Sequence, residues 1–161
     1  MTIKVGDHLP EATFKTMGPD GPKDVTTKDV FGGKKVALFA VPGAFTPTCH
    51  KQHIPAYVAK SAEFKKMGAD AIACTAVNDV FVLDAWAKAT GADGKLMMLA
   101  DGSADFARKL GLDNDLTARG MGVRSKRYSM LVDNGVVKAL NVETEPKVDK
   151  SSADTLLACK F

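Results

Sequence analysis

The sequence predicts one α/β domain, residues 1–161, in which helices flank a mixed central sheet behind an N-terminal extension. Apolar runs suited to buried strands alternate with helix-like segments through the middle of the chain, and two strands joined by an Asn-Gly turn follow near the C-terminus. A chain of 161 residues can bury a real core, and no linker-like change of composition divides it.

The N-terminal extension covers residues 1–33. It is rich in turn formers, such as those of Gly18–Pro22, and has few long apolar runs, so we expect short strands or loops and a small helix near Thr27–Phe31. The first long apolar run, Lys35–Val41, stops at Pro42 and is typical of a central strand covered on both faces.

A long helix is expected over Pro47–Met67, where apolar residues recur at roughly helical spacing and Gly68 supplies a stop. Pro55 interrupts it, because proline cannot donate to the carbonyl four residues back and its ring crowds that turn. We therefore predict a kink just after the first turn.

The remaining elements continue the alternation. Strands are expected over Asp70–Val77, Leu96–Ala100, Arg127–Val132 and Val136–Val142, and helices over Val80–Thr90, Ser103–Leu110 and Ser151–Cys159. The expected caps and turns are Asn78-Asp79 before a helix, Gly91 after it, Asp133-Asn134-Gly135 between the last strands, and Ser151 or Ser152 at the final helix.

Composition argues against two classes of function, nucleic-acid binding and membrane insertion. Charged residues make up 25% and apolar residues 45%, and a scattered net charge of +3 gives no basic patch for nucleic acid. The N-terminus lacks the apolar core of a signal peptide, and no run reaches the roughly 18 apolar residues of a membrane span. We expect a cytoplasmic protein that binds neither nucleic acid nor membrane.

The chain has three cysteines, Cys49, Cys74 and Cys159, an odd number without a CxxC pair or a metal-like cluster. This spacing favours neither a disulfide framework nor a zinc site. A disulfide oxidoreductase is also disfavoured, because Cys49 has no partner cysteine two or three residues away.

Cys49 is the first candidate for a reactive group. It lies where the strand Lys35–Val41 passes into a helix, and the unpaired N–H groups of a helix N-terminus favour an anion such as a thiolate. Pro42 stiffens the connecting loop, and the Thr46 hydroxyl is suited to bond a backbone N–H or an oxygen substrate. These residues predict a preorganised thiolate site.

The stretch Pro42–Cys49, followed by His53-Ile54-Pro55, resembles the active-site signature of the peroxiredoxins, in particular the type II, peroxiredoxin-5-like group. The resemblance extends to Ala73–Asp79, Arg127–Val132 and Asn134–Glu143. It covers most of the chain and implies a thioredoxin-like fold.

The resemblance implies a thiol-dependent peroxidase without metal, haem or flavin. Cys49 matches the peroxidatic cysteine, whose thiolate reduces H2O2 or an alkyl hydroperoxide and becomes a sulfenic acid. Thr46 and Arg127 match the other catalytic positions, and Pro42 matches the proline that shields the site. Without the resemblance, Arg127 reads as a solvated charge at the start of a strand.

The resemblance also bears on the catalytic cycle. Ser151 occupies the place where type II enzymes with two cysteines carry a resolving cysteine, so we expect a one-cysteine cycle in preference to resolution by Cys159. Cys74, inside an apolar strand, reads as structural. The external reductant is glutathione with glutaredoxin, which we favour, or thioredoxin. The family implies a homodimer.

Two other interpretations stay open. The first is a non-catalytic thioredoxin-fold module, either a redox sensor or a chaperone-like protein. The second is a metal or general-base role for His50 and His53, which we disfavour because no third ligand is near in the sequence. We expect His53 to orient a loop or interface, His50 to be partly exposed, and Trp86 to lie in the core or at a subunit contact.

Overall fold

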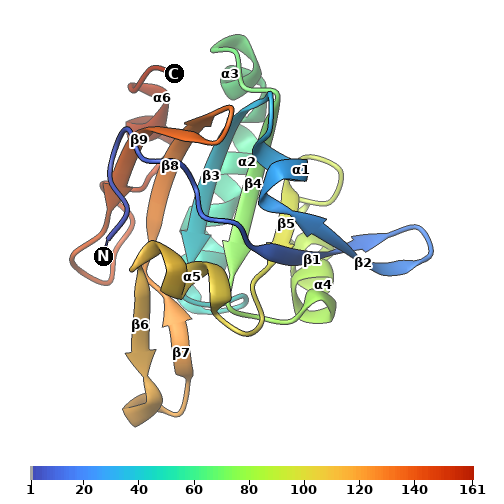
Figure 1. Cartoon of the computed structure of the whole chain (residues 1–161). Coiled ribbons are helices and arrows are strands. Elements are labelled where there is room, and N and C mark those ends of the chain that lie inside the picture. Colours follow the sequence, from blue (N-terminus) through green and yellow to red (C-terminus); the bar gives the residue numbers. More distant parts are fainter. Residues whose placement is uncertain (1) are drawn as a thin grey trace.

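The computed structural model describes residues 2–161. Its main element is a mixed sheet of seven strands in the order β2-β1-β5-β4-β3-β8-β9, with a separate two-stranded ribbon, β6-β7, projecting from one end (Figure 1). The strands β3, β4 and β5 are parallel, whereas β8 runs antiparallel to β3 and β9 antiparallel to β8. The expected α/β class with a mixed sheet is confirmed.

The strands are β1 (Thr13–Gly18), β2 (Gly21–Thr26), β3 (Lys35–Val41), β4 (Ala71–Ala76), β5 (Met97–Ala100), β6 (Asp113–Leu116), β7 (Gly122–Ser125), β8 (Tyr128–Asp133) and β9 (Val136–Val142). The helices are α1 (Thr27–Phe31), α2 (Ile54–Ala59), α3 (Ser61–Lys66), α4 (Val80–Thr90), α5 (Asp105–Leu110) and α6 (Ala153–Leu157). A π-helical turn, η1 (Cys49–His53), precedes α2, and a 3-10 turn, η2 (Thr117–Arg119), joins β6 to β7.

Strand β3 is the central strand that its apolar run predicted. Its residues alternate between two buried clusters: Phe39 and Val41 face the one that contains Cys49 and Trp86, and Leu38 faces the other. The period of two places successive side chains on opposite faces, and burial on both faces accounts for a continuous apolar run.

Several local signals operate as predicted. Asp79 caps α4 by accepting from the Val82 N–H, and Gly91 ends that helix in the left-handed conformation. Asn134 and Gly135 both adopt positive φ in the β8-β9 turn, which is the conformation that this hairpin requires. Ser152 caps α6.

The N-terminal extension is joined to the main sheet. Strand β1 pairs with β2 along its length and with β5 at Lys15 and Ala100, and Phe14 is fully buried. The ribbon β6-β7 was missed in the sequence, because its first strand, Asp113–Leu116, is polar and mostly exposed and therefore carries no apolar period.

The single helix expected over Pro47–Met67 is wrong in detail: it is divided into η1, α2 and α3. In η1 the Ile54 N–H bonds to the Cys49 carbonyl five residues back. Pro55 directly follows this wide turn and has no N–H to donate to the carbonyl of Lys51. The helix is therefore irregular near its start, where a kink was predicted, and the irregularity is a π-turn. A second break, at Lys60, had no signal that we recognised.

No helix among residues 2–161 is long and apolar enough to span a membrane.

Candidate active site

The site forms where β3 ends and β8 begins. The two strands are antiparallel with Ala40 opposite Tyr128, so the loop after Val41 lies beside Arg127, the residue before β8. The chain then turns through η1, which begins with Cys49. Sheet register thus brings together two residues that are 78 positions apart.

The Arg127 guanidinium contacts the Cys49 sulfur directly. Its Nη2 donates to Sγ over 3.0 Å, and Cys49 is fully buried while Arg127 is only 8% exposed. Among residues 2–161, no carboxylate lies within ion-pair distance of this guanidinium. A buried cation without an anionic partner is costly, and a thiolate on Cys49 would supply that anion.

His53 aligns the same guanidinium from the other side. Arg127 Nη1 donates to His53 Nδ1 over 2.9 Å, and His53 Nε2 lies 3.0 Å from the Ser151 carbonyl oxygen. An arginine can only donate, so Nδ1 accepts and Nε2 carries the proton of a neutral ring. Burial, reinforced by the Arg127 charge, lowers the pKa of His53 from 6.5 to about 4.

Thr46 and Pro42 lie in the loop before Cys49. The Thr46 hydroxyl donates to the Gly43 carbonyl over 2.7 Å, so its proton is committed and its oxygen can still accept. Thr46 also starts the helix, since its carbonyl accepts from the His50 N–H. The expected bond from a backbone N–H to this hydroxyl is not formed among the described residues.

A second arginine, Arg124 on β7, lies over this loop. Its Nε donates to the Met121 carbonyl, and its Nη1 is 3.4 Å from the Pro42 carbonyl. A Cβ at Gly43 would come within 2.9 Å of Arg124 Nη1, so only glycine permits this approach without a shift. Sequence reasoning missed Arg124 because the ribbon that carries it was missed.

His50 belongs to an aromatic group at the edge of the site. Its Nδ1 accepts from Trp86 Nε1 over 3.0 Å, and the ring stacks on Phe45, which is 51% exposed. His50 is partly exposed and Trp86 is fully buried in the core, as expected. The two histidines therefore face different partners, and residues 2–161 contain no group of three or more potential metal ligands.

Among the described residues, neither of the other cysteines is hydrogen-bonded to Cys49, Arg127 or His53. Cys74 is fully buried in β4, and burial raises the pKa of its thiol well above the usual value, which keeps it protonated. Cys159 follows α6, is partly buried, and lies 3.5 Å from the Thr155 carbonyl oxygen. All three thiols are free.

Of the four predicted residues, the structure brings Arg127 into contact with Cys49 and places Pro42 and Thr46 in the loop between β3 and η1. Sequence reasoning gave His53 an orienting role but no partner, it noted Ser151 only as a helix cap and at the place of the resolving cysteine, and it gave Glu143 no role. The contact between His53 and Ser151 joins residues 98 positions apart, so no local spacing in the sequence predicts it.

Known proteins of one family resemble this chain over nearly its full length. The redoxin family matches residues 4–157. The chloroplastic peroxiredoxin-2E of Arabidopsis thaliana is 47% identical over 160 residues, which cover 97% of this chain and 68% of that protein.

Two solved structures share the fold. The reduced Prx3 of Vibrio vulnificus in complex with H2O2 has a TM-score of 0.93 and 46% identity over 98% of each chain. Peroxiredoxin 5 from Alvinella pompejana has a TM-score of 0.84 and 39% identity over 96% of each chain. The chain therefore belongs to the redoxin family, as a type II peroxiredoxin with a thioredoxin-like fold, and it is a thiol-dependent peroxidase.

Proposed function

We propose that Cys49 is the peroxidatic cysteine and that Arg127, Thr46 and Pro42 complete its site. The observation that carries the proposal is the 3.0 Å contact between Arg127 Nη2 and Cys49 Sγ in a buried setting. A fixed cation next to a thiol stabilises the thiolate, which is the nucleophilic form.

The substrates are H2O2 and alkyl hydroperoxides. The Cys49 thiolate attacks one peroxide oxygen, so that an S–O bond forms while the O–O bond breaks and the sulfur loses two electrons. The departing oxygen leaves as hydroxide or alkoxide and takes a proton to become water or an alcohol. Cys49 is left as a sulfenic acid.

The surrounding groups suit this step. Negative charge moves from sulfur to the departing oxygen, and the guanidinium offers several donors to follow it. The Thr46 oxygen, whose proton is held by the Gly43 carbonyl, accepts the O–H of the peroxide and thereby orients it. Pro42 fixes the loop that carries Thr46 and shields the thiolate from water.

The sulfenic acid is reduced by an external thiol. That thiol attacks the sulfur, water leaves, and a second thiol releases the mixed disulfide. Ser151, in place of a resolving cysteine, supports a one-cysteine cycle with glutathione and glutaredoxin, or else thioredoxin. Since Cys49 is fully buried, a protein reductant requires the π-turn Cys49–His53 to open.

The protein acts as a cytoplasmic antioxidant enzyme, a single domain over residues 1–161 and a homodimer. Phe45 and Phe81 support the dimer, because both are large apolar side chains more than half exposed, and Phe45 lies beside the site. A subunit interface over these side chains would remove them from water.

The test is peroxide consumption with glutathione and glutaredoxin, and in parallel with thioredoxin, by Cys49→Ser. We expect its activity to be abolished with either reductant. The matched control, Cys74→Ser, should keep most of the activity. Consumption of peroxide by Cys49→Ser at the parent rate would exclude the mechanism.

A further inference from the structure

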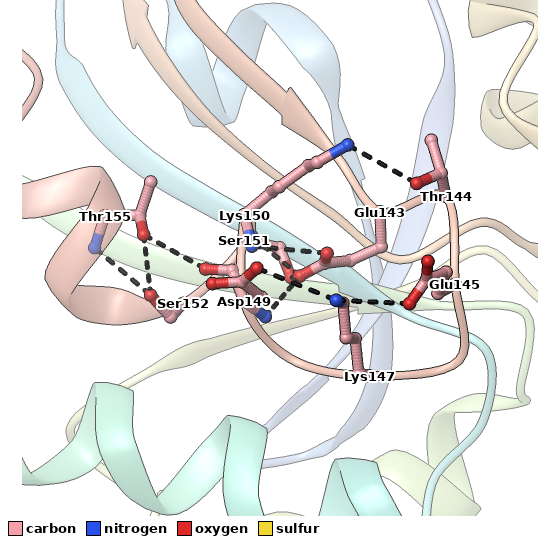
Figure 2. A network of polar contacts seen from close by, with 9 residues as sticks. All are labelled: Glu143, Thr144, Glu145, Lys147, Asp149, Lys150, Ser151, Ser152 and Thr155. Carbon is pink, nitrogen blue, oxygen red and sulfur yellow. Dashed lines mark hydrogen bonds and ion pairs between the residues drawn. The ribbon is translucent and has the colours of Figure 1, made fainter.

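The carboxylate of Glu143, just after β9, holds the loop that leads to α6. It accepts from the N–H groups of Asp149, Lys150 and Ser151 over 2.7, 3.2 and 2.8 Å, and from the Ser151 hydroxyl over 2.7 Å (Figure 2). We call Glu143 and residues 149–151 the Glu143 clasp. Four donors on one carboxylate fix the loop more firmly than any other side chain in it does.

The clasp holds an ionised carboxylate. Burial acts to raise the pKa of Glu143, but the hydrogen bonds from Ser151, Asp149 and Lys150 outweigh it and lower the pKa below its ordinary 4.5. At neutral pH the carboxylate is therefore an acceptor for all four donors.

The carbonyl of Ser151 faces away from the clasp, toward the active site. It lies 3.0 Å from His53 Nε2 and accepts from the Tyr57 hydroxyl over 2.8 Å. His53, Tyr57 and Ser151 are all fully buried, so water cannot replace either bond. This carbonyl at Nε2 and the Arg127 donor at Nδ1 together fix where the His53 ring lies and which nitrogen carries its proton.

The contacts close a ring around Arg127. The Glu143 N–H donates to the Arg127 carbonyl over 2.9 Å, which extends the β8-β9 ladder by one residue. From Glu143 the path runs through Ser151 and His53 back to the Arg127 side chain. The main chain and the guanidinium of Arg127 are thus both positioned from Glu143.

We propose that Glu143 is a positioning residue for the peroxidase reaction: it holds the Ser151 carbonyl, which orients His53, which in turn aims Arg127 at Cys49. This proposal rests on the peroxidatic role of Cys49. Ser151 reaches His53 through its main-chain carbonyl, and its hydroxyl is one of the four donors that hold it to Glu143.

We expect loss of the clasp to release the Ser151 carbonyl. Without Glu143, the three N–H groups of the loop turn toward water, and the Ser151 carbonyl moves with them. His53 then loses the acceptor for Nε2–H, and the neutral ring is free to carry its proton on Nδ1, where it opposes the donor of Arg127. The guanidinium is then no longer held with Nη2 pointing at the Cys49 sulfur. The sheet and the loop before Cys49 are unchanged.

The experiment measures the second-order rate at which H2O2 oxidises Cys49 in the folded protein, well below its unfolding temperature. We expect Glu143→Ala to slow this rate by about 100-fold, the order associated with a misplaced catalytic group. Glu143→Gln keeps an acceptor oxygen and should restore part of the rate. The matched control is Glu145→Ala, in the same loop, whose exposed carboxylate pairs with Lys147 at 3.1 Å and does not reach Ser151.

A double-mutant cycle separates positioning from general stability. His53→Phe keeps an aromatic ring, though a larger one, and removes both hydrogen bonds, so in that background Glu143→Ala should add little further loss. Equal fractional losses with and without His53 would overturn the proposal, as would a parent rate in Glu143→Ala. If Glu143→Ala does not fold, Glu143→Gln enters the same cycle. Failure of the proposed function itself would instead show as activity in Cys49→Ser.

Discussion

The Arg127 guanidinium donates to the Cys49 sulfur over 3.0 Å through one nitrogen and to His53 through the other. The two contacts use the planar fork of the side chain, which an ammonium group does not have. Replacing Arg127 by lysine keeps the charge and removes the fork.

We therefore expect Arg127→Lys to slow oxidation of Cys49 by H2O2 about 100-fold, the effect typical of losing one fixed donor at a developing charge. Stopped-flow measurement of sulfenic acid formation checks this. The control is Lys126→Ala, since Lys126 is adjacent but exposed. An unchanged rate in Arg127→Lys would remove the guanidinium from the mechanism.

His53 makes stability depend on pH. Its pKa is lowered to about 4 in the folded protein from the ordinary 6.5, so between these values the unfolded chain binds more protons. The contribution of His53 to the free energy of unfolding is fully present above about pH 6.5, and it is lost as the pH falls toward 4. A shift of this size corresponds to about 3 kcal/mol.

Urea unfolding between pH 7 and 4 measures this loss. The charged and titratable groups around His53 are Arg127 before β8, Glu143 after β9 and Tyr57 on α2. Since the pKa of Glu143 is lowered from its ordinary 4.5, protonation of Glu143 adds a loss of stability below that pH. His53→Gln keeps a donor and an acceptor but cannot titrate. A parent-like loss of stability above pH 5 in this variant would assign it to another group.

Gly43→Ala tests the close approach of Arg124 to the active-site loop. The added Cβ would lie 2.9 Å from Arg124 Nη1 and 3.2 Å from Thr46 Cγ2, so both side chains must shift. We expect a loss of about 1 kcal/mol in the free energy of unfolding and a slower reaction with H2O2.

The second substitution Arg124→Ala should recover most of the stability, because the nearer contact is removed. The control is Gly102→Ala, where the nearest atom is 3.5 Å from the new Cβ. Loss of equal size at Gly102 would show that the effect is not specific to the site.

The resolution step is tested by intact mass after one equivalent of H2O2. We expect the gain of one oxygen on Cys49, identical in the parent and in Cys159→Ser, because the Cys159 thiol donates to the Thr155 carbonyl over 3.5 Å and forms no disulfide with the fully buried Cys49. A disulfide between Cys49 and Cys159, lost in Cys159→Ser, would overturn the one-cysteine cycle.

The sequence by itself determined much of this protein. The apolar run Lys35–Val41, the caps at Asp79 and Gly91, and the Asn134-Gly135 turn are local signals, so each gave its element directly. The sequence also predicted that Cys49 is reactive, because that prediction rests on its position at a strand-to-helix junction. Arg127 was identified through the family resemblance alone.

Only the tertiary structure decided the rest. The π-turn at Cys49–His53 and the polar ribbon β6-β7 carry no apolar period. The antiparallel register of β3 and β8 brings Arg127 to Cys49, and a buried carboxylate far along the chain fixes the carbonyl that holds His53. A single sequence specifies such partners only through packing, because hydrogen bonds between distant residues leave no spacing to read.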